Sequence, residues 1–469
     1  MKMGTWETRS INWDKMFHRY ETIMAGNDDS LRVQVTMKLG HMSKLAPESI
    51  LASAVPVLVE LLSRPFDNQS PSIQEAAAYC LKRVAFQGEG RLAVIIGQCG
   101  AIPPLLSLLQ TSEGRLLEVI LKCLRNLVTF SDGNRLTVAR DGGLIIILRM
   151  LDSSSSGIRR PLLEILSALS FLREARRVIF NSGRVGYLVE SVRCGSMISR
   201  TRAAQAIGLL GLVKQARGSL VRFGALEALL ALIQDGDTSV KLVASNAIGV
   251  ISSHVDHIRP VAQAGAIPIF AEILEGCEEP MGKEIVEDVF CILAVVEENA
   301  VEIFQHLVRI LRGSNNEAKA TAADIIWDLA SYKHLTSVMQ NSGAIPILVE
   351  LLRDGTEDIK EKVSGAVAQL SYEEAARHAL ADSGAIPLLT QLLETESPEM
   401  IDNAAEALMR FAEDPSFSER ICSVISSSLL RNVRGRLMQM RESEAAQLDS
   451  SLRDLSIQHL AGDPSLGFM

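Results

Sequence analysis

The sequence predicts an all-α solenoid, a fold in which short helices stack as repeats, and three observations lead to this prediction. The tetrapeptide Gly-Ala-Ile-Pro occurs four times, beginning at Gly100, Gly265, Gly343 and Gly384. Each copy is followed by a leucine-rich run, such as LLSLL or LVELL, which indicates an apolar helix face. The junctions recur at a constant period in the forties, which is typical of helical repeat arrays.

Each tetrapeptide predicts a sharp turn between two helices. Gly is common just after a helix end because it reaches positive φ without a Cβ clash, and Pro is tolerated in the first turn of the next helix. Degenerate junctions fill the gaps at Ser53 to Pro56, Gly142, Gly183 and Gly224. Consecutive junctions from Gly142 to Gly265, and again from Gly343 to Gly384, are 41 residues apart. Length alone would favour about three domains, but this constant step predicts one array.

The repeat pattern divides the chain into an N-terminal extension or cap over residues 1–30, repeats over 31–412, C-terminal capping helices over 413–440 and a mobile tail over 441–469. In the extension, Trp13, Phe17 and Tyr20 share one helix face. Because terminal repeats expose an apolar end, this face predicts a lid over the first repeat. A helix that docks a partner is the alternative.

Within a unit, a short helix precedes the Gly, a second follows the Pro, and a longer third helix follows a polar turn, as in Gly355 to Ser371. Two units are irregular. The loop Arg64 to Ser72 lengthens one of them. The segment 276–301 is distorted and its successor lacks the tetrapeptide, which predicts a kink or a long loop.

Composition favours a soluble protein with reduced thiols. The 469 residues contain 47 Lys plus Arg and 56 Asp plus Glu, a balance that disfavours wholesale binding to nucleic acid or membranes. The seven Cys are scattered without a close pair, which predicts a cytoplasmic or nuclear protein with no disulfide framework or zinc site. No apolar stretch approaches membrane-spanning length and no signal peptide is recognisable, so we expect no membrane anchor.

These units resemble armadillo repeats, which share the three-helix pattern and a period near this one. The resemblance covers residues 31 to 430 and rests on the tetrapeptide and on third helices that end in CLRNLV (Cys123 to Val128) or AVAQLS (Ala366 to Ser371). It is strongest to the plant armadillo-repeat proteins and the vacuolar-protein-8 type. It implies a right-handed superhelix of about nine to ten repeats, and a binding scaffold whose third helices line a concave groove.

In armadillo proteins, an Asn near the end of each third helix typically bonds the backbone of an extended peptide. Carried over position by position, the resemblance implies a partner-binding groove formed by Lys44, Tyr79, Arg83, Lys122, Asn126, Gln205, Asn246, Asp324, Asp328, Gln369 and Arg410. Only Asn126 keeps the family residue at its position, and the equivalent Ala168, Leu209 and Val250 cannot form such bonds. The paired Trp and Asn of nuclear-import receptors do not occur in this sequence, which disfavours that function.

Charge is distributed unevenly along the chain. Residues 101 to 220 hold 17 Lys plus Arg and 8 Asp plus Glu, whereas residues 221 to 420 hold 14 and 33. Such an asymmetry would steer acidic partner segments toward six arginines of the basic part and basic segments toward the later repeats. The six are Arg125, Arg159, Arg160, Arg176, Arg177 and Arg202. The alternative is that these charges are solvated convex faces.

Our first hypothesis is a non-catalytic adaptor in which Lys44, Arg83, Lys122 and Asn126 contact an acidic or phosphorylated segment of a protein partner. A substrate-recruiting part of a ubiquitin ligase complex is the second, although no U-box precedes the repeats. The third is nucleic-acid binding through the basic part, which lacks the interleaved aromatics that favour it.

An enzyme is disfavoured, because the sequence has no phosphate loop, no GxSxG and no recognised metal motif around His254 and His257. We expect no cofactor, metal or small-molecule substrate. Asp324 and Asp328 share a helix face at i, i+4, where they would suit a cation or a partner Arg if they are more than a solvated acidic stripe.

Overall fold

The computed structural model describes residues 12–26, 28–63, 71–153, 156–276 and 279–417, together with 420, 421 and 435. Every regular element in these ranges is a helix, which confirms the predicted all-α solenoid. Residues 64–70 of the predicted loop, most of the predicted capping helices at 413–440 and the whole tail at 441–469 lie outside the described residues. The chain forms two compact units, Met1–Ile251 (the N-terminal unit) and Ser252–Met469 (the C-terminal unit).

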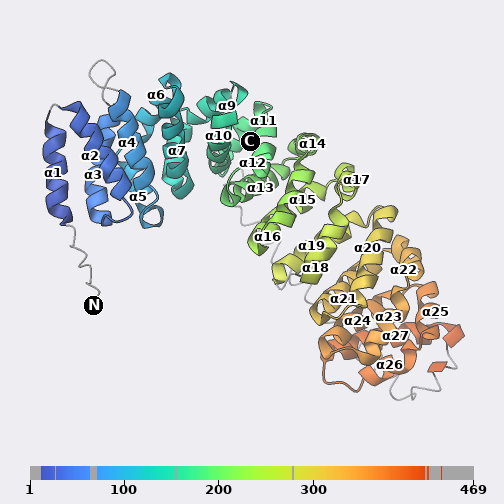
Figure 1. Cartoon of the computed structure of the whole chain (residues 1–469). Helices are drawn as coiled ribbons and strands as arrows, with labels where there is room; N and C mark the ends of the chain where they lie inside the picture. Colours follow the sequence, from blue (N-terminus) through green and yellow to red (C-terminus); the bar gives the residue numbers. More distant parts are fainter. Residues whose placement is uncertain are drawn as a thin grey trace, which may run out of the picture. The chain divides into compact units, whose positions relative to one another are not determined.

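The helices of the N-terminal unit follow one another with short connections (Figure 1). They are α1 (Trp13–Ala25), α2 (Asp29–Met42), α3 (Glu48–Ser63), α4 (Pro71–Val84), η2 (Gly88–Gly90), α5 (Arg91–Gln98), α6 (Ile102–Thr111), α7 (Gly114–Phe130), α8 (Asp132–Arg140), α9 (Gly143–Ser153), α10 (Ser156–Leu169), α11 (Arg173–Asn181), α12 (Gly186–Arg193), α13 (Met197–Gly211), α14 (Lys214–Arg222), α15 (Ala225–Asp235) and α16 (Thr238–Ser252).

The C-terminal unit continues the same pattern. Its helices are α17 (Val255–Gln263), α18 (Ala266–Gly276), α19 (Pro280–Leu293), α20 (Glu297–Leu311), α21 (Asn316–Ala330), η3 (Lys333–Leu335), α22 (Thr336–Ser342), α23 (Ala344–Asp354), α24 (Glu357–Leu370), α25 (Glu374–Asp382), α26 (Ala385–Leu392), α27 (Pro398–Glu413) and η4 (Pro415–Phe417).

The junction glycines adopt the conformation that the sequence predicts. All seven, from Gly100 to Gly384, have φ between 71° and 86°, a region that only Gly enters at little cost. At Gly100 the chain turns by 80° between the η2–α5 segment, Gly88–Gln98, and α6. The predicted junction at Ser53 to Pro56 is wrong, because α3 continues through it with Pro56 inside the helix. No Gly is present there to reverse the backbone, so the chain stays helical.

Third helices of successive repeats pack side by side within each unit (Figure 1). In the N-terminal unit α2 packs on α4, α4 on α7, α7 on α10 and α10 on α13; in the C-terminal unit α19 packs on α21, α21 on α24 and α24 on α27. Their inward faces bury small and aliphatic residues, such as Ala77, Leu124 and Leu329, which are fully buried. Equivalent positions of neighbouring repeats therefore lie next to each other.

The segment 276–301 contains a regular helix, α19, so the prediction of a long loop there is wrong. The irregularity lies in the next repeat, where α20 is one 15-residue helix in place of the usual first and second helices. The physical reason is local: without a Gly at the junction, nothing reverses the backbone, and Ile303, Phe304, Leu307 and Val308 form one continuous buried face.

Candidate functional site

A basic pocket of about 550 Å³ lies where α2, α4 and α7 approach their C-terminal ends. We call it the basic pocket and define it by Lys44, Lys82, Arg83, Phe86, Gln87, Lys122, Arg125 and Asn126. Four of the predicted groove residues are thus brought together. Stacking explains this, because three consecutive third helices place equivalent positions side by side.

Positive charge in the basic pocket exceeds the negative charge that faces it. Lys122 pairs with Glu118 at 2.8 Å, and Arg125 pairs with Glu164 at 3.1 Å. Within the described part of the chain, Lys44 and Arg83 have no ion-pair partner. Five cationic side chains are therefore faced by two carboxylates.

Crowding of like charges is visible at Lys82. Burial, followed by the charges of Lys122 and Arg83, lowers the pKa of the Lys82 ammonium. Its Nζ lies 4.6 Å from the centre of the Tyr79 ring, where the face of the ring attracts it. Tyr79, a predicted groove residue, is half-buried and already covered on that face.

Asn126, the residue that keeps the family identity, is committed to the fold. It is 2% exposed, and its Nδ2 donates to the main-chain carbonyl of Lys82 at 2.9 Å. Its Oδ1 accepts from the Arg125 guanidinium at 3.0 Å. It lines the pocket floor, but both ends of its amide are used within the protein, because it ties α7 to α4.

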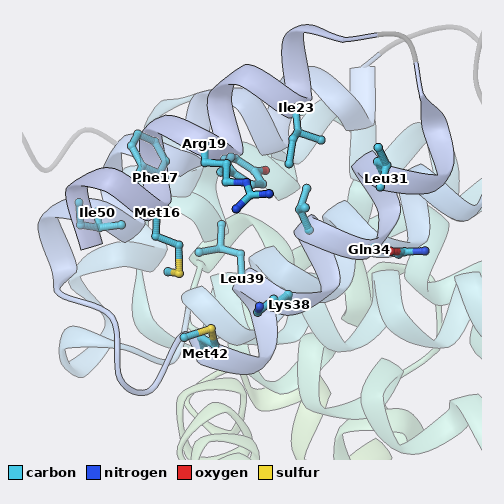
Figure 2. Close-up of a pocket in the computed structure, with 12 residues that line it drawn as sticks. Met16, Phe17, Arg19, Ile23, Leu31, Gln34, Lys38, Leu39, Met42 and Ile50 are labelled. Carbon is cyan, nitrogen blue, oxygen red and sulfur yellow. The ribbon is translucent and has the colours of Figure 1, made fainter. Parts of the chain in front are cut away.

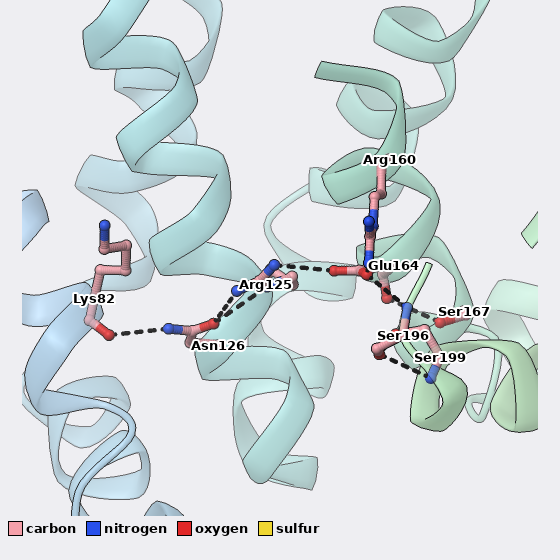
Figure 3. A network of polar contacts seen from close by, with 8 residues as sticks. All are labelled: Lys82, Arg125, Asn126, Arg160, Glu164, Ser167, Ser196 and Ser199. Carbon is pink, nitrogen blue, oxygen red and sulfur yellow. Dashed lines mark hydrogen bonds and ion pairs between the residues drawn. The ribbon is translucent and has the colours of Figure 1, made fainter. Parts of the chain in front are cut away.

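A polar network leads from Asn126 into the next repeat (Figure 3). The carboxylate of Glu164, in α10, accepts hydrogen bonds from Arg125 at 3.1 Å and from the main-chain N–H of Ser196 at 2.9 Å. Arg160 approaches the same carboxylate at 3.4 Å. Glu164 is 4% exposed, so it fixes Arg125 at the pocket wall from within the core.

Much of the predicted basic surface is also used internally. Arg159 forms a two-pronged pair with Glu190, and Arg202 donates to the Thr129 carbonyl at 2.9 Å. Arg176 donates to the carbonyls of Ser170 and Phe171, both at 2.8 Å, and so caps the end of α10. These arginines stabilise the repeats. Fewer basic side chains are therefore available to a partner than the count of basic residues in the sequence indicates.

The remaining predicted groove residues do not line the basic pocket. Gln205 in α13 and Asn246 in α16 are exposed, and Gln369 in α24 is half-buried. In the C-terminal unit, Arg410 covers the Tyr372 ring at 4.2 Å and pairs with Glu413 at 3.0 Å.

Asp324 and Asp328 of α21 belong to an acidic cluster with Glu287 and Asp288 of α19. Burial, followed by the hydrogen bond and charge of Asp328, raises the pKa of Glu287 to about 8. Lys362 of α24 pairs with Asp324 at 3.2 Å. Within the described residues, no group of three or more His, Cys, Asp or Glu side chains is arranged to hold a metal ion.

A second cavity, of about 420 Å³, lies between α1 and α2 with Ile50 of α3 (Figure 2). Its walls are mostly apolar, with Met16, Phe17, Leu39 and Met42 pointing inward. Phe17 and Tyr20 share this face, with ring centres 5.9 Å apart, as their spacing predicts. The lining does not single out a ligand.

Sequence reasoning missed three lining residues of the basic pocket, namely Lys82, Phe86 and Gln87. The family pattern places one or two positions of each repeat in the groove, whereas the last turn of α4 contributes Lys82 as well as Arg83. The run Lys82 to Gln87 was the available signal, because it places two cations and an aromatic ring at one helix end.

No single helix in the described ranges is long and apolar enough to cross a membrane. The segments Gly88–Gln98 and Ile102–Thr111 pass a test of length and composition only as a bent pair. The five described Cys are free: Cys80 and Cys123 are buried, Cys99 and Cys291 are half-buried, and Cys194 is exposed.

Comparison with known proteins supports the predicted repeats. The family model for the armadillo/β-catenin-like repeat matches residues 91–129 and 374–408. Vacuolar protein 8 of Schizosaccharomyces pombe is 26% identical over 226 residues, which cover 44% of this chain and 37% of that protein. The match therefore spans little more than a third of this relative. This relative comes from a fission yeast, so the resemblance to plant proteins stays a prediction.

Two solved structures align with this chain. An engineered protein aligns with a TM-score of 0.62 and 21% identity over 84% of this chain and 98% of its own. A designed armadillo repeat protein in complex with the peptide (KR)4 aligns with a TM-score of 0.39 and 22% identity, over 48% of this chain and 99% of its own. The first similarity supports the fold.

Proposed function

Because two segments of this chain match the armadillo/β-catenin-like repeat model, we propose that it is a non-catalytic scaffold that binds an extended acidic or phosphorylated segment of a protein partner in the basic pocket. The main support for this proposal is an imbalance of charge. Five cationic side chains line the basic pocket of about 550 Å³, and two carboxylates pair with them. The pKa of Lys82 is lowered first by burial and then by the charges of Lys122 and Arg83, and an anionic side chain would relieve that repulsion.

The chemistry of the lining suits this ligand. Arg83 offers a planar fork of donors for a carboxylate or phosphate, and Lys44 and Lys122 add point charges. Each hydrogen bond to a charged group contributes about 1.5–3 kcal/mol when water is partly displaced. Because the pocket opens to solvent, the affinity should fall as salt concentration rises.

A purely structural role explains the charges less well. Lys82 and Arg83 lie in the last turn of α4, where cations complement the helix dipole. Lys122 lies in the middle of α7, beyond the reach of that effect. The helix dipole therefore does not account for Lys122.

The proposal is tested with a fluorescein-labelled phosphoserine peptide, measured by fluorescence anisotropy at two salt concentrations. We expect the double variant Arg83→Glu, Lys122→Glu to weaken binding by at least about tenfold, because two attractions become repulsions. The matched control is Arg140→Glu, Arg149→Glu, which makes the same charge change at exposed positions of the N-terminal unit outside the pocket lining. It should change the affinity less than about twofold.

Equal weakening by both double variants would mean that only net charge matters, and would overturn the proposal. So would a preference for single-stranded RNA over the peptide at equal charge, because that outcome would favour the nucleic-acid alternative. Circular dichroism of each variant shows whether the helices are retained.

A further inference from the structure

Phe86 is the apolar residue of the basic pocket, and it is held in an exposed position. It follows the end of α4, and 56% of its surface is exposed. Its ring contacts the ring of Phe130 edge to face, with centres 5.4 Å apart and planes at 78°. The Lys82 ammonium lies over Tyr79 instead. Phe86 is therefore fixed on one side and exposed on the other.

Large apolar residues lie at or within three residues of the ends of several third helices of the N-terminal unit, although not at one equivalent position. Third helices α2, α4, α7, α10 and α13 end at or just before Leu45, Phe86, Phe130, Phe171 and Leu212. Leu45, which follows the pocket residue Lys44, is 70% exposed. Single exposed apolar residues are common on soluble proteins, but Phe86 differs because it forms part of the wall of the charged pocket.

We infer that the partner segment carries an aromatic residue two positions from its acidic or phosphorylated residue. This inference rests on the proposed function and specifies its ligand. In an extended peptide, side chains two positions apart point to the same side, about 6.6–7 Å from one another. The anionic group contacts Lys44, Arg83 and Lys122, and the aromatic ring packs on the free face of Phe86.

Charge and shape both favour this occupant. The cations demand an anion, whereas the apolar wall at Phe86 cannot hydrogen-bond and is best covered by a hydrocarbon surface. Aromatic pairs prefer offset or edge-to-face contacts with centres about 4.5–7 Å apart. The Phe86–Phe130 pair already has such a geometry, and a third ring would extend it.

The test uses four labelled peptides on a Gly/Ser background. The first contains phosphoserine-Gly-Phe, the second replaces Phe by Ala, the third moves Phe next to the phosphoserine, and the fourth lacks the phosphate. We expect wild type to bind the first about three- to tenfold more tightly than the second and third, as aromatic packing contributes. The fourth should bind most weakly.

Phe86→Ala should remove this difference by weakening the first peptide alone, while its affinity for the Ala peptide stays within about twofold of wild type. That second affinity also shows that the pocket remains folded. Phe86→Leu should give an intermediate preference. If Phe86→Ala weakens the binding of the first two peptides equally, or changes the binding of neither peptide, the inference is wrong although the pocket still binds phosphate. If wild type does not prefer phosphorylated peptides at all, the proposed function fails first.

Discussion

The side-chain amide of Asn126 in α7 donates a hydrogen bond to the main-chain carbonyl of Lys82 in α4, with 2.9 Å between Nδ2 and the oxygen. This bond joins two neighbouring third helices at the floor of the basic pocket. A residue type that would read a peptide backbone is used here to hold the repeats together.

We expect Asn126→Leu, which keeps the approximate volume, to lower the free energy of unfolding by about 1–3 kcal/mol, because the Lys82 carbonyl and the Arg125 guanidinium lose a buried partner. Urea denaturation followed by circular dichroism measures this. Gln205→Leu, at an exposed position of α13, is the control and should change stability by less than about 0.5 kcal/mol. A variant that keeps its stability but loses peptide binding would show that Asn126 contacts the partner.

Glu164 offers a second test, because it is the buried anion behind Arg125. Glu164→Gln should cost about 1–3 kcal/mol, since two arginines and the Ser196 N–H lose a charged acceptor. Phosphopeptide affinity should not fall, because the pocket gains net positive charge.

Glu118→Gln is the matched control for this prediction. It also removes one negative charge beside the pocket, but its pair with Lys122 is exposed and joins neighbouring turns of one helix, so stability should change by about 0.5 kcal/mol or less. Equal stability losses in the two variants, in urea titrations at the same pH, would contradict the structural role of Glu164.

The sequence predicted the features that depend on local chemistry or on the repeat. Gly100 and its equivalents turn the chain because only Gly adopts their backbone conformation cheaply. Lys44, Arg83 and Asn126 meet because stacked repeats align equivalent positions, and Lys122 lies one turn before Asn126. Ser53 to Pro56 shows the limit of this reasoning, because a Pro without a preceding Gly did not end α3.

The features that were missed depend on side-chain direction and long-range partners. The repeat period places Asn126 near the groove, but the rotation of α7 about its own axis turns it toward the Lys82 carbonyl. Arg176 was expected to steer partners, yet it caps α10, the third helix of the repeat before it. Glu287 and Asp328 lie 41 residues apart, in different helices, and only the packing of α19 on α21 brings them together.

Close packing between α21 and α24 leads to a third prediction. Gly365 of α24 faces the Trp327 ring so closely that an added Cβ would lie 2.5 Å from Cδ2. Gly365→Ala should therefore destabilise the protein by about 1–3 kcal/mol through overpacking, even though Ala favours helix by about 1 kcal/mol. Thermal unfolding followed by circular dichroism measures the change.

Gly218→Ala in α14 is the control for the steric argument. There an added Cβ meets nothing within 4 Å, so only helix propensity acts and the variant should be stabilised by up to about 1 kcal/mol. If Gly365→Ala also raised the unfolding temperature, the contact between Trp327 and α24 would have to be looser than the structure has it.

The acidic cluster of the C-terminal unit predicts a pH dependence of stability. The pKa of Glu287 is raised to about 8 by burial and by Asp328, whereas a Glu in an unfolded chain has a pKa of about 4.3. The folded state therefore holds more protons between these values, and its stability should fall as the pH rises through this window.

Glu287→Gln removes the titrating group. At pH 5 the variant should resemble wild type, and at pH 8.5 it should be more stable by on the order of 1 kcal/mol, a value well below the full shift because solvent screens this half-exposed side chain. The measurement is the midpoint of urea unfolding at the two pH values. Glu284→Gln, at an exposed position of the same helix, is the control and should leave the pH dependence unchanged. A Glu287→Gln variant with the same pH slope as wild type would contradict the raised pKa of Glu287 in the folded protein.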